Sequence, residues 1–84
     1  MEIKILGPGC PKCKTLEKVT REAVAETGID ATVEKVEDIV KIMSYNVFQT
    51  PVLVIDEKII LKGVVPSVKE VKEILLNHKK QLSV

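Results

Sequence analysis

The chain has 84 residues, which is room for one domain and too little for a second hydrophobic core. Hydrophobic residues make up 45% and charged residues 30%, a balance typical of a folded globular protein and unlike a disordered one. The formal net charge is +1, with both signs spread along the chain, and no apolar run approaches the roughly 20 residues of a membrane span. We therefore expect a single domain over residues 1–84, located in the cytoplasm, with neither a nucleic acid nor a membrane as partner.

The N-terminal part of the chain predicts a strand, a helix and a second strand. Residues 1–6 alternate apolar and polar side chains, which indicates a strand that ends at the Gly-Pro-Gly run of residues 7–9. From Pro11 to Gly28, apolar or small side chains recur every three or four residues, as on one face of a helix. Residues 31–36 are rich in β-branched side chains and suit a second strand, joined to the first by a right-handed crossover.

The middle of the chain predicts a short helix followed by a hairpin. Residues 37–46 suit the helix, and one of its faces carries Ile39, Ile42 and Met43. Residues 52–55 are all apolar, which is typical of a strand covered on both faces. A turn at residues 56–58 then leads into residues 59–61, so these two strands form an antiparallel pair.

A terminal helix completes the predicted fold. Ser67 and Glu70 have the spacing of a capping box at its start. Its apolar face carries Val68, Val71, Ile74, Leu75 and His78. We expect His78 to be the half-covered last residue of that face rather than a ligand or a base. The element order is βαβαββα, which predicts an α/β protein with a four-stranded mixed sheet between three helices.

The strongest chemical signal is the cysteine pair in the run Gly-Cys-Pro-Lys-Cys at residues 9–13. Pro11 suits the first helical position, which places Cys10 at the helix cap beside backbone amides that have no partner. The helix end carries roughly +0.5 of an elementary charge, and Lys12 adds a cation nearby. We therefore predict a pKa for the Cys10 thiol below the ordinary value of about 8.5.

Cys13 begins the apolar face of the first helix, so its sulfur is expected to point toward the core and differ from that of Cys10. This difference predicts a division of labour in thiol–disulfide exchange. Cys10 attacks a substrate disulfide, and Cys13 resolves the mixed disulfide, which leaves a reversible Cys10–Cys13 disulfide. The predicted function is a thiol–disulfide oxidoreductase that acts on protein disulfides.

Two other interpretations of the cysteine pair stay open at this point. A zinc site usually needs four ligands, and besides the two cysteines the chain has a single histidine, His78, whereas copper(I) needs only two thiolates. Small metallochaperones also carry Cys-X-X-Cys before a first helix, but helices near residues 39–43 and from residue 68 onward contradict their element order. The third interpretation is an interaction module in which the cysteines have no chemical role.

The run at residues 9–13, the element order and Thr50-Pro51 before the third strand together resemble the small thioredoxin-like redox-active disulfide proteins, which stand between thioredoxins and glutaredoxins. The resemblance implies a thioredoxin-like fold without a cofactor. It implies that the Thr50–Pro51 bond is cis, that Pro51 packs against the cysteine pair and that the Thr50 backbone faces the substrate. It also implies a thioredoxin-reductase-like flavoprotein as electron donor, and we expect a monomer.

Some residues depart from the better-known relatives. Gly9 stands where thioredoxins usually have a tryptophan, and Lys4 is the strand residue nearest to where they have a buried acid. Glutaredoxins bind glutathione partly through an acidic residue after the hairpin, whereas this chain has no acid there until Glu70. We therefore expect a reductase rather than glutathione to supply the electrons. Tyr45 and Phe48 suit either a substrate surface or rim packing.

Overall fold

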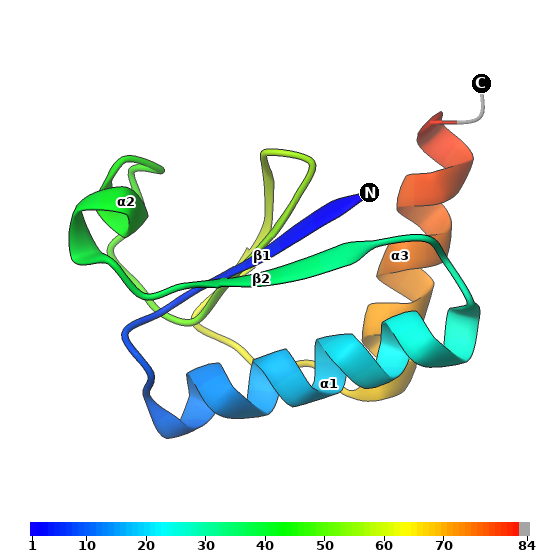
Figure 1. Cartoon of the computed structure of the whole chain (residues 1–84), viewed down its shortest axis with the longest axis horizontal. Coiled ribbons are helices and arrows are strands. Elements are labelled where there is room, and N and C mark those ends of the chain that lie inside the picture. Colours follow the sequence, from blue (N-terminus) through cyan, green and yellow to red (C-terminus); the bar gives the residue numbers. More distant parts are fainter. Residues whose placement is uncertain (83–84) are drawn as a thin grey trace.

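The computed structural model describes residues 1–82, which form four strands and three helices in the predicted order βαβαββα (Figure 1). The elements are β1 (Glu2–Leu6), α1 (Pro11–Thr27), β2 (Thr32–Val36), α2 (Ile39–Met43), β3 (Val52–Ile55), β4 (Lys58–Lys62) and α3 (Val68–Leu82). The mixed sheet and the element order confirm the predicted fold class. The predicted boundaries agree with the structure to within a residue or two, except at α2.

The sheet has the strand order β2-β1-β3-β4, which places β1 and β3 at its centre. β1 and β2 are parallel, with Ile3 opposite Val33, whereas β1 and β3 are antiparallel, with Ile5 opposite Leu53. All four residues of β3 are buried, as expected for an apolar strand between two covered faces. β4 closes the sheet as the antiparallel partner of β3.

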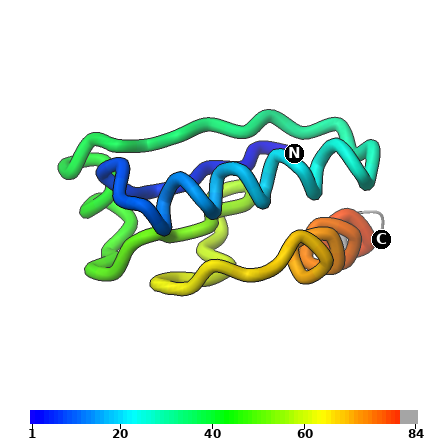
Figure 2. Tube along the Cα trace, turned by 90° about the horizontal axis from the view of Figure 1, so that it is seen from below, coloured from blue at the N-terminus to red at the C-terminus, as the bar shows by residue number. Residues whose placement is uncertain are grey.

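Two apolar cores lie on opposite faces of the sheet. On one face, α1 and α3 pack together over alternate side chains of the central strands, and Figure 2 shows the two helices beside each other. This first core includes Ile3, Ile5, Leu16, Leu53, Ile55 and Leu75. On the other face, Ile42 of α2 packs with Val47 and with side chains of β2 and β3. The two central strands are thereby covered on both faces.

The helix α2 is shorter than the sequence predicts. Asp38 caps it by accepting a hydrogen bond from the Val40 amide at 2.9 Å, and the regular helix ends at Met43. Because five residues make little more than one turn, one large side chain, Ile42, faces the sheet, while Ile39 and Met43 are each 54% exposed. The prediction of a helix over residues 37–46 was therefore wrong in length.

The start of α3 confirms the predicted capping box. The Glu70 amide donates to Ser67 Oγ at 3.2 Å, and the Ser67 amide donates to Glu70 Oε1 at 3.2 Å. Farther along, His78 is only 6% exposed, so the expectation of a half-covered residue was wrong. His78 Nε2 lies 2.9 Å from Asp56 Oδ2 in the turn between β3 and β4, and this polar partner accounts for its burial.

Candidate active site

The two cysteines lie at the N-terminus of α1, immediately after the loop that leaves β1. They form a disulfide with a Cα–Cα distance of 5.0 Å. Pro11 is the first helical residue, and Cys10 caps the helix with its Sγ accepting a hydrogen bond from the Cys13 amide at 3.2 Å. The predicted placement of the Cys10 sulfur beside the free amides of the helix end is therefore present in the structure.

The two sulfurs have different surroundings. Cys13 is 5% exposed and begins the buried face of α1, while Cys10 is partly exposed. Gly7 permits this packing, because a Cβ at Gly7 would overlap Cys13 Sγ. The same Cβ position lies 3.8 Å from the Cβ of Thr50, so Cys13 and Thr50 both lie beside Gly7. Sequence reasoning treated Gly7 only as the end of a strand, and nothing local to it indicates this contact.

The loop before β3 forms the second side of the site. The Thr50–Pro51 peptide bond is cis, Pro51 is fully buried, and Thr50 is exposed. The Gly63 amide donates to the Pro51 carbonyl at 2.8 Å, which joins this loop to the one that follows β4. Gln49 packs against Gly63, where a Cβ would stand 3.1 Å from Gln49 Oε1. The cis bond that the family resemblance implied is thus present.

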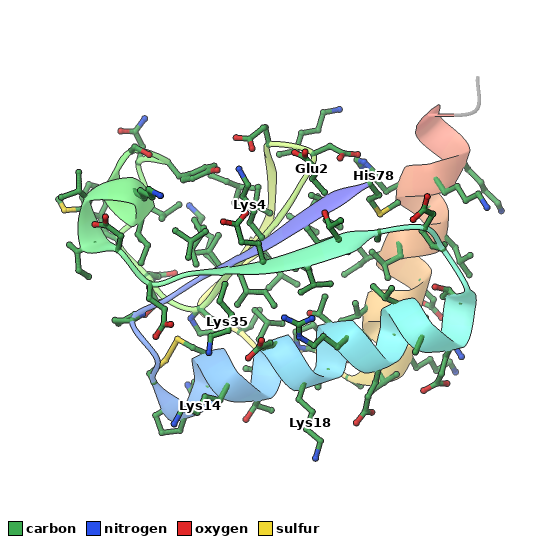
Figure 3. All side chains as sticks on the ribbon, in the orientation of Figure 1. Glu2, Lys4, Lys14, Lys18, Lys35 and His78 are labelled. Atoms are coloured by element: carbon green, nitrogen blue, oxygen red, sulfur yellow. A yellow bond between two sulfur atoms is a disulfide. The ribbon has the colours of Figure 1, made fainter. Side chains whose placement is uncertain are left out.

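Charged side chains surround the reactive end of α1. Lys12 is exposed to solvent on the first turn of the helix. Glu37, which follows β2, places Oε2 3.1 Å from where a Gly9 Cβ would stand. Lys35 Nζ lies 3.9 Å from Glu37 Oε1 and 3.7 Å from Glu17 Oε1 on α1, and Figure 3 shows Lys35 between β2 and the start of α1.

Sequence reasoning missed Glu37, which it assigned to the start of the second helix. A signal was present, because the C-terminal ends of two parallel strands meet at one edge of a sheet. Glu37 directly follows the second of these strands, as the loop to Cys10 follows the first.

Lys4 and the two aromatic residues contribute to packing and to the surface in different ways. Lys4 Nζ donates to Glu57 Oε1 at 2.6 Å and to the Tyr45 hydroxyl at 3.3 Å, and the hydrogen bond to Glu57 raises the pKa of Lys4. The same bond, followed by one from Tyr45, lowers the pKa of Glu57. Tyr45 therefore anchors the segment after α2, whereas Phe48 is 87% exposed.

The described residues contain no cluster of ligands of the kind that a zinc site needs. Within residues 1–82, no three side chains of the metal-ligating types gather around a common point. Figure 3 shows His78 at the opposite end of the sheet from the disulfide, where its partner is Asp56. In that same part of the chain, no helix has the length and the apolar character needed to cross a membrane.

Comparisons with known proteins agree with the fold and the cysteine pair. A family model described as "Thioredoxin domain" matches residues 1–76. A protein named thioredoxin from Methanocaldococcus jannaschii is 43% identical over 76 residues, which is 90% of this chain and 87% of the relative. Another protein named thioredoxin, from Methanothermobacter thermautotrophicus, is 43% identical over 75 residues, or 89% of this chain and 97% of the relative.

Proposed function

The chain belongs to the thioredoxin domain family, and we propose that Cys10 and Cys13 are the catalytic residues with which it reduces disulfides in proteins. Like its thioredoxin relatives, the protein is a thiol–disulfide oxidoreductase. One observation carries the assignment of the site to these residues. The disulfide lies at the start of α1 and joins a buried cysteine, Cys13, to a partly exposed one, Cys10, which is the asymmetry that a two-step exchange requires.

In the first step, the Cys10 thiolate attacks one sulfur of the substrate disulfide. A bond forms between Cys10 Sγ and that sulfur, and the second substrate sulfur leaves as a thiolate that takes a proton from solvent. The amide of Cys13 points at Cys10 Sγ, and the positive end of α1 lies beside it, so both stabilise the attacking thiolate.

In the second step, Cys13 loses its proton and attacks Cys10 Sγ. The Cys10–Cys13 disulfide forms, the mixed disulfide breaks, and the remaining substrate sulfur leaves as a thiolate. Two electrons have then passed from the cysteine pair to the substrate. The burial of Cys13 supports its role as the resolving residue, because a buried thiol does not reach a disulfide in another protein.

Thr50 and Pro51 are proposed to position the substrate beside the cysteines. Thr50 is exposed next to the Gly7 and Cys13 contact, while buried Pro51 holds the loop in place. Pro11 sets the start of α1, and Lys12 adds a positive charge near the attacking sulfur. A reductase partner must return the electrons, and we propose a thioredoxin-reductase-like flavoprotein rather than glutathione. The cytoplasmic location and the monomeric state stay predictions.

The assignment is tested by changing each cysteine in turn. Cys10→Ser is expected to abolish reduction of a protein disulfide such as that of insulin, because it removes the attacking thiolate. Cys13→Ser is expected to retain the first step and to accumulate a covalent mixed disulfide, which mass spectrometry detects under non-reducing conditions. Thr15→Ser on the exposed face of α1 serves as the control and should retain full activity. Full turnover in either cysteine variant would contradict the assignment.

A further inference from the structure

A carboxylate that the exchange steps above do not use lies against the residue before Cys10. Glu37 Oε2 is 3.1 Å from the position that a Gly9 Cβ would occupy. Gly9 has a φ of +90°, which glycine adopts readily, and its missing side chain leaves the space that the carboxylate enters. The Glu37 carboxylate therefore lies beside the residue that precedes Cys10.

The sheet determines this placement. β1 and β2 are parallel with Leu6 opposite Val36, and the Gly7 amide extends the ladder by donating to the Val36 carbonyl at 2.9 Å. The residue that follows Val36 must then run beside the loop from Gly7 to Cys10. The ladder therefore places the backbone of Glu37 beside this loop.

The negative charge of Glu37 is only partly neutralised, because its cationic partner Lys35 also lies near Glu17. Lys35 Nζ is 3.9 Å from Glu37 Oε1, a long contact, and lies closer to Glu17 Oε1 at 3.7 Å. Arg21 neutralises the other oxygen of Glu17 at 3.0 Å, and the Glu37 side chain stays 55% exposed. Lys35 is thus a cation that partly offsets Glu37 near the active site (Figure 3).

Other groups at the start of α1 act with the opposite sign to Glu37. Lys12 and Lys14 on α1 are exposed and favour the thiolate, as does the positive end of the helix. The loop before β3 contributes Gln49 and Thr50, which have no charge. Glu37 is therefore a negative charge set against several positive contributions at the same sulfur.

We propose that Glu37 is a positioning residue for the redox reaction, whose charge makes the Cys10–Cys13 pair a stronger reductant. This inference rests on the proposed role of Cys10 as the attacking thiolate. A nearby negative charge destabilises the thiolate that exists only in the reduced protein, so it favours the disulfide. The pair then gives up its electrons more readily, while the helix end keeps enough thiolate for attack.

The test compares the full-length wild type with Glu37→Gln and with Glu73→Gln, a matched charge change on α3 away from the active site. Thiolate absorbance of the reduced proteins gives the pKa of Cys10, and equilibration with glutathione redox buffers gives the stability of the disulfide. Glu37→Gln should lower the pKa of Cys10 by roughly 0.3 to 0.4 unit, the effect of a unit charge about 8 to 10 Å away in water. The equilibrium constant for disulfide formation should fall about two- to threefold.

Lys35→Gln gives a second arm with the opposite sign, because it leaves Glu37 without its cation. It should raise the pKa of Cys10 and strengthen the disulfide, because it removes a positive charge beside Glu37. The inference would be overturned if Glu37→Gln gave the same pKa of Cys10 and the same disulfide stability as Glu73→Gln. It would also be overturned if Lys35→Gln shifted the pKa of Cys10 in the same direction as Glu37→Gln. If the wild type itself shows no reversible disulfide, the proposed function fails instead, so the two failures are distinguishable.

Discussion

At the scale of single residues, the site depends on glycines whose neighbours come from elsewhere in the chain. Gly7 lies against Cys13, and Gly9 lies against Glu37, yet the two differ in backbone conformation. Gly9 has a positive φ, a backbone conformation that glycine adopts more readily than other residues. The requirement at Gly7 is a contact instead, because a side chain there would overlap the sulfur of Cys13.

Gly7→Ala is therefore expected to disturb the packing of Cys13, the proposed resolving residue. The added methyl would overlap Cys13 Sγ and lie 3.1 Å from its Cβ, so the helix start must shift, at a cost of about 1 to 3 kcal/mol. We expect a lower free energy of unfolding in denaturant titrations, together with slower insulin reduction.

Gly28→Ala is the control for this substitution. Its Cβ would meet nothing within 4 Å, but its φ is +69°, so it should lower stability by about 1 kcal/mol through backbone strain. Because Gly28 lies at the far end of α1 from the cysteines, activity should not change. If Gly7→Ala kept the stability and activity of the wild type, the close contact between Gly7 and Cys13 would be contradicted.

At the scale of elements, α1 carries the Cys10–Cys13 disulfide at its start and packs against the core along its buried face. Its N-terminus carries Cys10 and Pro11, and its C-terminus ends at Gly28, whose amide donates to the Val24 carbonyl at 3.1 Å. The buried face of the helix includes Thr20, which is fully buried. Among residues 1–82, the Thr20 hydroxyl finds no hydrogen-bond partner.

Thr20→Val should stabilise the protein, because valine has nearly the same shape and removes the unsatisfied hydroxyl. The expected gain is about 1 kcal/mol in the free energy of unfolding, measured by urea titration of the oxidised protein. Thr15 provides a matched comparison on the exposed face, where its hydroxyl donates to the Pro11 carbonyl at 3.0 Å. Thr15→Val should therefore give no gain, and a loss of stability in Thr20→Val would contradict the prediction.

The elements differ in how well local signals predict them. The limits of α1 and α3 follow from Pro11, Gly28 and the Ser67 capping box, which act within a turn of the helix end. The length of α2 does not follow from local signals. The segment 44–46 leaves the helical path, and Asn46 has a φ of +59°. That turn places Tyr45 against Glu57 in a distant hairpin, and tertiary contact overrides the helical pattern there.

At the scale of the whole molecule, a polar cluster joins three distant segments at the end of the sheet away from the cysteines. Asp56 in the β3–β4 turn accepts from the Glu2 amide at 2.8 Å and lies 2.9 Å from His78 Nε2 on α3. The bond from Glu2, followed by that from His78, lowers the pKa of Asp56 from its ordinary 3.8. The cluster thus connects the N-terminal strand, the hairpin and the last helix.

This cluster predicts a loss of stability in acid. A carboxylate whose pKa is lower in the folded state stabilises that state fully above its unfolded pKa of about 3.9. The contribution is lost as the pH falls through the lower folded value. Asp56→Asn should therefore lower the free energy of unfolding by about 1 kcal/mol at pH 7, since one charge-assisted bond is lost.

The pH dependence of this difference is the measurement that checks the role of Asp56. Urea titrations from pH 7 to pH 2 should show the difference between wild type and Asp56→Asn shrinking below about pH 4. Asp30→Asn changes an exposed carboxylate and serves as the control. A difference that stays constant down to pH 2 would mean that the Asp56 charge does not stabilise the fold.

The sequence by itself determined the features that depend on neighbours a few residues apart. The cysteine spacing, the cap at Cys10, the Pro11 start and the buried face from Cys13 are local, because helix geometry relates residues three and four apart. The element order followed from local patterns along the rest of the chain, and it favoured the redox interpretation of the cysteine pair over the metal-binding one. The family match agrees with both.

Only the tertiary structure decided which distant residues meet. Glu37 reaches Gly9 because β2 lies parallel to β1, and Thr50 reaches Gly7 because β3 lies antiparallel on its other side. Such contacts depend on strand order and register, which many sequences with the same local pattern could realise differently. The charge beside Gly9 and the packing of Cys13 are therefore properties of the folded sheet.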